Sequence, residues 1–284
     1  QREDETMDYV TLNNGVKMPQ LGYGVYQTPT EETESCVLTA IKNGYRSIDT
    51  AQAYGNEEGV GQAIVKCGLP REELFITTKI WISNAGYEKA KASIEESLKK
   101  LKTDYVDLLL IHQPLGDYYG TYRAMEEAYK AGKARAIGVS NFYPDRYIDI
   151  AHFAEVVPAV NQVETHVFQQ QKVAREYLAK HNTQIMSWGP FAEGKNDFFN
   201  TPVLKEIGAK YGKSVAQVAL RFLLQNGVVV IPKSTHEERM QENFNVFDFV
   251  LTDEEMKQIE VLDTGKSLFF SHYSPETVEW FMSI

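Results

Sequence analysis

The stretch Tyr45–Glu57 reads YRSIDTAQAYGNE, and the rest of the chain is interpreted outward from it. It begins as a buried strand, with Tyr45 and Ile48 as its large apolar residues, and the apolar pattern breaks at Asp49. The phenol of Tyr54 follows in the next turn, so the pattern predicts two ionisable groups at one rim of a sheet. From this stretch alone, an Asp49 that caps a turn above a packed Tyr54 is an equally good interpretation.

Composition and charge exclude several classes of protein. The chain is 43% hydrophobic and 24% charged, as expected of a soluble globular enzyme, and its formal net charge of −10 without a basic run argues against a nucleic-acid partner. Its two cysteines, Cys36 and Cys67, are few enough to favour a reducing, cytoplasmic compartment. No apolar run reaches the roughly 18–20 residues of a membrane span. We therefore expect a cytoplasmic monomer with no membrane partner.

The polar N-terminus, QREDETMDYV, does not have the pattern of a signal peptide. Met7 could be the natural start, and residues 1–6 would then be a disordered or foreign extension.

Eight buried strands are expected after an N-terminal hairpin. The hairpin is indicated by Asn13-Asn14-Gly15 between alternating apolar residues. The eight strands are expected near Leu21, Tyr45, Leu74, Tyr105, Ala134, Ala159, Gln184 and Val228. Helices are expected over Thr30–Lys42, Glu57–Lys66, Tyr87–Leu101, Tyr122–Ala131, Pro144–Phe153, Gln169–Lys180, Thr201–Tyr211, Ser214–Gln225, His236–Asn243 and Thr252–Leu262.

This strict alternation predicts a parallel sheet with right-handed crossovers. Eight repeats in about 250 residues favour a closed (β/α)8 barrel, with the N-terminal hairpin closing its bottom. The alternative is an open doubly wound sheet, but Gly22-Tyr23-Gly24 lacks the third glycine of the fingerprint that such a sheet would carry. No linker or shift in composition divides the chain, so we predict a single domain over residues 1–284.

The C-terminal ends of barrel strands are where active sites are built. Lys79 directly follows the strand segment Ile76-Thr77-Thr78, so it is expected to be buried and to need a partner, for which Asp49 is the obvious choice. A plain salt bridge at the rim is the alternative for this pair. His112 ends the next apolar strand, where a histidine is often a hydrogen-bonded core residue.

The combination of these strand ends indicates chemistry. A lysine beside the Tyr54 phenol would lower its pKa from about 10. Such a tyrosine can donate a proton to a carbonyl oxygen, while the His112 imidazole orients the same oxygen. The arrangement suits protonation of an alkoxide that is formed by hydride attack.

Later strand ends suggest where a hydride donor would bind. Polar groups able to hold a carboxamide are expected at Ser140, Asn141 and Gln162, and Trp188 offers a flat face for an aromatic ring. An anion site is expected around a helix start, at Lys233, Ser234, Thr235 and Arg239. Packing at the barrel top and solvated surface charge remain the alternatives for these residues.

Together these motifs resemble the aldo-keto reductase superfamily, from about Val10 to Leu262. The motifs are LGYGVYQ, GYRSIDTAQAYGNEEGVG, REELFITTKIW, YVDLLLIH, AIGVSNF, NQVE, GKSVAQVALRF and IPKSTHEERMQEN. The segments SWGPFAEGK and SLFFSHYSPETVEW are most similar to bacterial members related to 2,5-diketo-D-gluconic acid reductases.

The resemblance implies an NADPH-dependent carbonyl reductase on a (β/α)8 barrel. It implies a catalytic tetrad in which Tyr54 donates the proton, Lys79 and Asp49 tune it, and His112 orients the carbonyl. It implies nicotinamide contacts at Ser140, Asn141, Gln162 and Trp188, 2′-phosphate contacts at Lys233, Ser234 and Arg239, and adenine contacts at Glu242 and Asn243. Thr235 is expected to bind the cofactor as well.

Three departures from the family pattern concern the substrate side. Gln113 stands where many members have Trp, Tyr26 occupies a position that is often a pocket Trp, and THVF follows Glu164 where many members have a His-Pro pair. We expect a small carbonyl compound or a keto-sugar in a pocket lined by Tyr26, Trp81 and Gln113. The tail residues Phe269, Phe270, His272 and Tyr273 could line the mouth of this pocket or merely cover the barrel side.

Other functions are compatible with the same fold. A glycoside hydrolase would need two carboxylates, for which Asp49 and Glu164 are the candidates. A non-catalytic NADPH-binding barrel, acting as a sensor or regulatory subunit, is the other alternative. A metal site is not expected, because no His-x-His follows the first strand.

Overall fold

The computed structural model describes residues 8–284 of the chain, so the proposed start at Met7 and extension of residues 1–6 lie outside the described part. Its strands are β1 (Tyr9–Thr11), β2 (Lys17–Pro19), β3 (Tyr23–Gly24), β4 (Ser47–Asp49), β5 (Phe75–Ile80), β6 (Leu108–Ile111), β7 (Ile137–Ser140), β8 (Val160–Glu164), β9 (Gln184–Trp188) and β10 (Val229–Val230). Its α-helices are α1 (Thr30–Lys42), α2 (Glu57–Lys66), α3 (Tyr87–Leu101), α4 (Tyr118–Lys130), α5 (Pro144–Phe153), α6 (Lys172–Ala179), α7 (Pro202–Tyr211), α8 (Val215–Gln225), α9 (Glu237–Phe244), α10 (Asp253–Glu260) and α11 (Pro275–Ser283). Four 3-10 segments are η1 (Gln52–Tyr54), η2 (Arg71–Glu73), η3 (Ile82–Asn84) and η4 (Ala192–Asn200).

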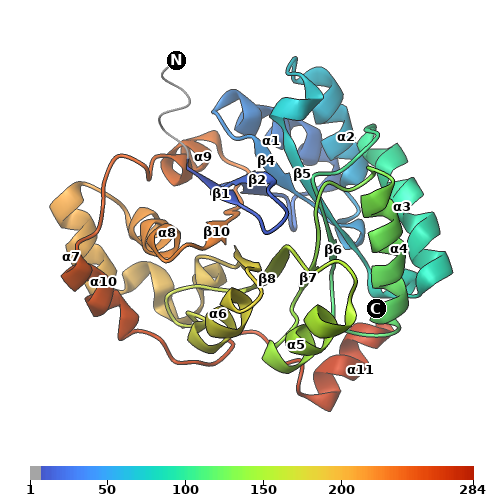
Figure 1. Ribbon diagram of the computed structural model, residues 1–284. Helices are drawn as coiled ribbons and strands as arrows, with labels where there is room; N and C mark the ends of the chain where they lie inside the picture. The colour runs from blue at the N-terminus through green and yellow to red at the C-terminus, as the bar shows by residue number, and fades with distance from the viewer. Residues whose placement is uncertain (1–7) are drawn as a thin grey trace.

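Strands β3 to β10 pair in chain order, each parallel to its neighbour. The last strand returns to the first, because Leu21 pairs in parallel with Val230 and Gly22 N donates to Val230 O at 2.8 Å. Helices surround the sheet in the ribbon view (Figure 1). These contacts confirm the predicted (β/α)8 barrel, and all eight expected strands are present. The single-domain division stays a prediction.

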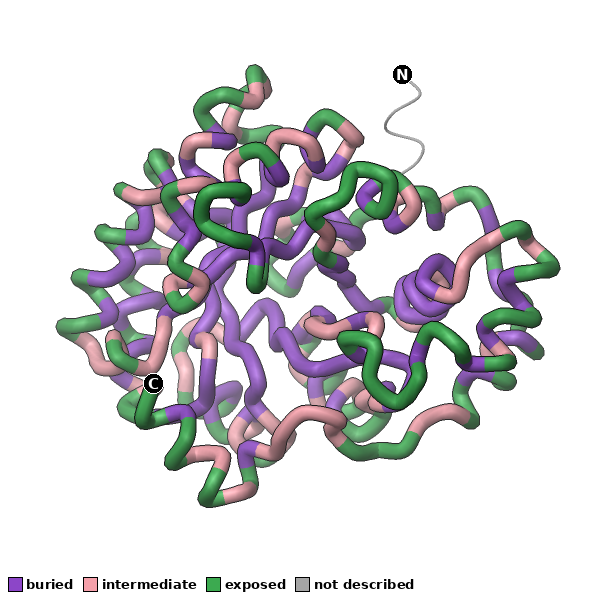
Figure 2. The backbone as a smooth tube through the Cα atoms, turned by 180° about the vertical axis from the view of Figure 1, so that it is seen from behind, coloured by how far each residue is buried: buried purple, intermediate pink, exposed green. Residues whose placement is uncertain are grey.

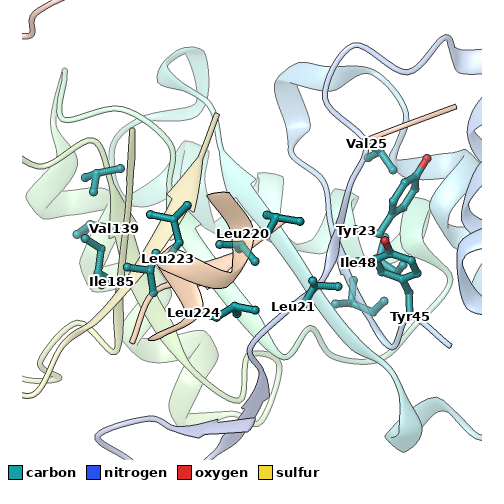
Figure 3. Packing of buried hydrophobic residues seen from close by; sticks show 14 of the residues in the cluster. Leu21, Tyr23, Val25, Tyr45, Ile48, Val139, Ile185, Leu220, Leu223 and Leu224 are labelled. Atoms are coloured by element: carbon teal, nitrogen blue, oxygen red, sulfur yellow. The ribbon is translucent and has the colours of Figure 1, made fainter. Parts of the chain in front are cut away.

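The backbone at the centre of the molecule is mostly buried (Figure 2). Alternation along the strands divides their buried residues between two clusters. In β6, Leu108 and Leu110 join a cluster built only from strands and the hairpin, which fills the barrel. Leu109 and Ile111 join the larger cluster that includes the helices. Figure 3 shows part of this outer cluster, with Leu220, Leu223 and Leu224 from α8 and Ile48, Val139 and Ile185 from barrel strands.

Successive side chains of a strand point to opposite faces, and this alternation also determines where the polar side chains point. Ile48 of β4 faces outward, so Asp49 faces the barrel interior. Ile76 and Ile80 of β5 also face outward, which puts Lys79 on the inner face. The polar residues at the strand ends therefore converge inside the top of the barrel.

The hairpin closes the opposite end, as predicted. Strands β1 and β2 pair antiparallel, and Leu12 and Met18 are buried in the inner cluster. Asn13 Nδ2 donates to Pro158 O at 3.1 Å, and Asn14 Nδ2 donates to Arg135 O at 2.9 Å. Both acceptors precede the strands β8 and β7, so the hairpin covers the N-terminal ends of the strands.

The helices follow the predicted ranges closely, with differences that have local causes. Helix α4 begins four residues earlier than predicted, at Tyr118, because Asp117 caps it by accepting from Gly120 N at 2.9 Å. Helix α6 begins only at Lys172, since Gln171 adopts a left-handed φ of 57°. Helix α11 was not predicted. It begins with Pro275 and lies near α5 (Figure 1).

Candidate active site

The floor of the site is an ion pair on adjacent strand ends. Lys79 is fully buried, and its Nζ donates to Asp49 Oδ1 at 2.6 Å, to Thr50 O at 3.0 Å and to the Tyr54 hydroxyl at 3.1 Å. Strand β4 supplies Asp49, β5 supplies Lys79, and the short helix η1 supplies Tyr54. The predicted partnership of Lys79 with Asp49 is confirmed. The Tyr54 hydroxyl lies beside the same ammonium.

Further hydrogen bonds support this buried ion pair. Asp49 Oδ2 accepts from Gln162 Nε2 at 3.0 Å. Burial acts to lower the pKa of Lys79, but the attraction of Asp49, together with Tyr54, outweighs it and raises the pKa above its usual value. Breaking one partner of such a pair leaves an uncompensated charge in the interior.

Tyr54 keeps its proton at neutral pH. Burial raises the pKa of the phenol above its ordinary value, the charge of Lys79 opposes this, and the charge of Asp49 adds to it. Our expectation of a net lowered pKa was therefore wrong. The physical reason is that burial destabilises the charged phenolate more strongly than the Lys79 ammonium stabilises it. The charge of Asp49 beside Lys79 weakens that stabilisation further. The result is a neutral phenol that can donate.

His112 is held as a neutral imidazole next to this phenol. Burial, and secondarily the charge of Lys79, holds the pKa of His112 well below its usual value. Its ring meets the rings of Tyr54 and Trp81 edge-on, at centroid distances of 5.7 and 5.1 Å. Its carbonyl oxygen accepts from Asn141 Nδ2 at 3.0 Å, which ties the end of β6 to the end of β7. A neutral imidazole carries one N–H donor, and His112 lines the cavity.

A cavity of about 1140 Å³ opens above the floor and joins most of the predicted residues. The tetrad residues that line it are Asp49, Tyr54 and His112, with Lys79 beneath them. The predicted cofactor and substrate residues that line it are Tyr26, Trp81, Gln113, Ser140, Asn141, Gln162, Trp188, Lys233, Arg239, Glu242 and Asn243. Ser234 and Thr235 do not line it. The Ser234 hydroxyl instead accepts from His236 N at 3.0 Å.

The middle of the cavity is a cluster of amides and one indole. Asn141 has a left-handed φ of 62°, a conformation that asparagine tolerates better than most residues and that is often found at functional sites. Its side-chain oxygen accepts from Trp188 Nε1 at 2.8 Å, and its backbone N–H donates to Gln162 O at 2.9 Å. Ser140 Oγ donates to the same carbonyl oxygen at 2.8 Å. These contacts fix polar groups that fit a carboxamide beside a flat aromatic face.

Two exposed cations, Lys233 and Arg239, also line the cavity. Lys233 Nζ donates to Gln27 Oε1 at 2.9 Å, lies 3.7 Å from Glu193 Oε1, and sits 4.7 Å from the centre of the Tyr26 ring. Arg239 lines the cavity from the first half of α9. Two exposed cations that line one cavity fit the phosphate group of a ligand.

Two segments that line the cavity were not expected from the sequence. They are the η4 loop, with Glu193 and Phe199, and the end of the chain, with Trp280, Phe281 and Ile284. The expected tail residues Phe269 and Phe270 also line it. Phe269 and Phe270 thus line the mouth, one of the two options left open above. His272 and Tyr273 do not line this cavity. Tyr273 is exposed, and His272 is buried against the rings of Phe270 and Phe281.

Glu164 is bound into the protein and does not line the cavity. Its oxygens accept from Ser267 Oγ at 2.5 Å and from Leu268 N at 3.0 Å. Phe168 N donates to His166 Nδ1 at 3.1 Å, so the proton is on His166 Nε2, which donates to Glu164 Oε2 at 2.7 Å. Glu164 therefore cannot serve as the second carboxylate of a glycoside hydrolase.

Two further observations concern residues 8–284. No group of three or more His, Cys, Asp and Glu side chains in this range is placed to share a metal ion. None of the helices in the same range combines the length and the apolar character needed to cross a membrane.

Comparison with known proteins identifies the family. Residues 15–264 match the model of the aldo/keto reductase family. The chain is 50% identical over 259 residues to the glyoxal reductase of Bacillus subtilis, a match that covers 90% of this chain and 93% of the relative. A solved structure of a putative 2,5-diketo-D-gluconic acid reductase B superposes with a TM-score of 0.90 at 39% identity, covering 97% and 99% of the two chains. A mutant of Gox0644 in complex with NADPH superposes with a TM-score of 0.88 at 39% identity, covering 93% and 97%.

These matches confirm the resemblance seen in the motifs. The chain belongs to the aldo/keto reductase family and is an oxidoreductase.

Proposed function

We propose that the protein reduces an aldehyde or ketone to an alcohol, with NADPH as cofactor and Tyr54 as proton donor. The observation that carries this proposal is the position of Lys79 Nζ, which contacts Asp49 Oδ1 at 2.6 Å and the Tyr54 hydroxyl at 3.1 Å while fully buried. The cavity above it exceeds the roughly 300–1,000 Å³ of a typical small-molecule site, so a cofactor and a substrate fit together.

The floor residues act on the carbonyl oxygen. The Tyr54 hydroxyl and the neutral His112 imidazole each donate a hydrogen bond to it and so orient the carbonyl carbon. As the carbon–oxygen double bond becomes an alkoxide, Tyr54 transfers its proton to the oxygen. The Lys79 ammonium stabilises the phenolate left behind, and Asp49 keeps that ammonium charged.

NADPH supplies the hydride that adds to the carbonyl carbon. Within the cavity, Ser140, Asn141 and Gln162 hold the carboxamide, and Trp188 presents its ring face to the nicotinamide. The phosphate end is bound by Lys233, Ser234, Thr235 and Arg239, and the adenine by Glu242 and Asn243. For Ser234 and Thr235 this role requires a local change, because neither lines the cavity as it stands.

The relatives support the class of substrate and the cofactor. The Bacillus subtilis relative is named a glyoxal reductase, and the Gox0644 structure holds NADPH. We extend both to this chain and propose a small carbonyl compound as substrate. We also propose that the chain acts as a single-domain monomer in the cytoplasm, where Cys36 and Cys67 would stay reduced, as both are free.

The direct test follows NADPH absorbance with purified protein and a panel containing methylglyoxal, an aromatic aldehyde and a keto-sugar. Oxidation of NADPH that depends on a carbonyl supports the proposal. Tight NADPH binding with no turnover of any compound would favour the non-catalytic barrel. Release of sugar from a glycoside without nicotinamide would favour a hydrolase.

A further inference from the structure

Two hydrogen bonds hold His272 of the tail. Its side chain bonds to the strand end that carries His112, and its backbone N–H donates to the Tyr143 hydroxyl at 3.1 Å. Gln113 directly follows His112 and is 6% exposed, and His272 of the tail is 3% exposed. The two side chains meet with Gln113 Oε1 2.6 Å from His272 Nε2. Because the amide oxygen accepts, the imidazole proton lies on Nε2. His272 Nδ1 is buried without a partner among the described residues, so the bond to Gln113 is the polar contact that its ring makes.

Aromatic side chains pack in a closed ring of contacts around this hydrogen bond. The ring of His272 stacks on Phe281 at 5.4 Å, with 7° between the planes. Phe281 meets Trp81 edge-on at 6.4 Å, and Trp81 meets His112 edge-on at 5.1 Å. The path from His112 through Trp81, Phe281 and His272 therefore returns to Gln113, the neighbour of His112 in the chain. Two strand ends and the tail are packed as one unit.

The cavity face of this unit is apolar. Phe270, Trp280 and Phe281 line the cavity on the tail side, and Phe270 also meets His272 edge-on at 5.1 Å. The lining cations come from other elements, Lys233 from the segment after β10 and Arg239 from α9. At the start of the tail, Lys195 Nζ lies 4.6 Å from the centre of the Phe269 ring. A substrate that reaches the tail therefore meets aromatic surface.

We propose that His272 is a positioning residue, which holds residues 267–284 (the C-terminal wall) against the site through Gln113 and thereby determines how well bulky aromatic aldehydes are reduced. The inference rests on the proposed reductase function. An aromatic aldehyde with its carbonyl at Tyr54 extends to the C-terminal wall, whereas methylglyoxal is too small to reach it. Loss of the bond displaces the wall and leaves the buried amide oxygen of Gln113 without a partner.

The test compares 4-nitrobenzaldehyde with methylglyoxal as substrates for four proteins. They are the wild type, His272→Leu, which removes the donor, His272→Gln, which can place an amide N–H where Nε2 lies, and the control Tyr273→Phe. Tyr273 is adjacent but 65% exposed, and its hydroxyl donates to Asp145 Oδ1 at 3.2 Å.

In His272→Leu we expect KM for 4-nitrobenzaldehyde to rise by about tenfold, the usual cost of a lost buried hydrogen bond. We expect kcat/KM for methylglyoxal to stay within about twofold. This substrate does not reach the C-terminal wall, so the substitution removes none of its contacts. His272→Gln should recover most of the loss, and Tyr273→Phe should match the wild type. Equal losses for both aldehydes, no loss for either, or a His272→Gln variant as poor as His272→Leu would overturn the proposal.

Two additional measurements keep the outcome decisive. If His272→Leu fails to fold, His272→Phe replaces it, because it keeps an aromatic ring beside Phe281 and removes the donor. Hydrogen exchange of the C-terminal wall is measured on the same proteins, with β5 as internal reference. Faster exchange confined to the C-terminal wall in His272→Leu supports the positioning role, and unchanged exchange contradicts it. This readout does not need enzyme activity, so it remains valid if the wild type reduces neither aldehyde and the proposed function fails.

Discussion

The floor of the site and the C-terminal wall differ in how the fold holds them. Asp49 and Lys79 of the floor sit on paired strands, and each buried charged atom has hydrogen-bonding partners. The C-terminal wall is attached by separate side-chain hydrogen bonds, which include the Tyr143 hydroxyl accepting from His272 N at 3.1 Å and Asp145 Oδ1 accepting from the Tyr273 hydroxyl at 3.2 Å. Glu164 binds the start of the wall, and Gln113 binds His272 in its middle.

The difference separates chemistry from selectivity. A floor fixed by strand register has little freedom to move, which suits proton transfer that requires a defined geometry. A wall with few polar attachments can change by substitution without disturbing the barrel. We therefore expect floor variants to lower kcat for every substrate, and wall variants to act according to substrate size.

The largest effect is expected from removing the floor ammonium. Lys79→Met keeps the side-chain length but removes the shared partner of Asp49 and Tyr54. We expect kcat to fall by about a hundredfold to ten-thousandfold for large and small aldehydes alike, the usual contribution of acid–base groups. Steady-state kinetics measures the loss, with circular dichroism to confirm folding. A loss restricted to bulky aldehydes would break the division between floor and wall.

A smaller effect is expected at the phosphate end, which belongs to neither region. Arg239→Ala should weaken NADPH binding by about ten- to a hundredfold, because a charge-assisted hydrogen bond is lost. NADH binding and the rank order of aldehydes should stay nearly unchanged. Dissociation constants from tryptophan fluorescence give the comparison, and equal weakening for NADH and NADPH would refute a phosphate contact.

Loosening the start of the C-terminal wall should have a smaller effect again. Glu164→Gln replaces a carboxylate that accepts from Ser267, Leu268 and His166 with an amide that has one acceptor oxygen. We expect a loss of about 1–3 kcal/mol in the free energy of unfolding. Urea denaturation measures this, and selectivity should shift toward small aldehydes. Unchanged selectivity in a folded variant would show that Glu164 does not position the wall.

The smallest effect is a dependence of stability on pH. Burial, and secondarily Arg146, lowers the pKa of His272 from 6.5 to about 4. The unfolded chain therefore binds a proton at this site more readily than the folded chain between these two values. Stability from this group is present above pH 6.5 and declines as the pH falls toward 4.

Between pH 7 and pH 5 we expect His272 to account for about 1–2 kcal/mol of lost stability. Urea denaturation of wild type and His272→Gln at both pH values isolates this contribution, since His112 is common to both proteins. Groups packed around His272 that could contribute are Tyr143, Asp145 and Arg146, and they are also unchanged. Identical pH dependence in the two proteins would contradict the buried, neutral state of His272.

The same contrast explains what the sequence could predict. Alternation along β4 and β5 is visible as residue pattern, and parallel strands share one carboxyl edge, so the convergence of Asp49 and Lys79 followed from simple rules. The raised pKa of Tyr54 did not, because it depends on burial in the folded site.

The start of the C-terminal wall is irregular and shows no alternation of apolar and polar residues from which its position could be predicted. His272 and Gln113 are separated by 159 residues, and no rule of spacing brings an irregular segment to a chosen strand end. The η4 loop was missed for a related reason, since Glu193 and Asn196 adopt left-handed conformations that residues other than glycine seldom take. Helix α11 did leave a signal, because Ser274 followed by Pro275 is typical of a helix start.

The central claim is that Tyr54 donates the proton, and Tyr54→Phe tests it most directly. The variant keeps the ring that packs against His112 and Tyr26 and removes only the hydroxyl beside Lys79. We expect kcat for methylglyoxal reduction to fall by about a hundredfold or more, while the dissociation constant of NADPH changes by less than about twofold. A variant that binds NADPH normally and retains wild-type kcat would contradict the account.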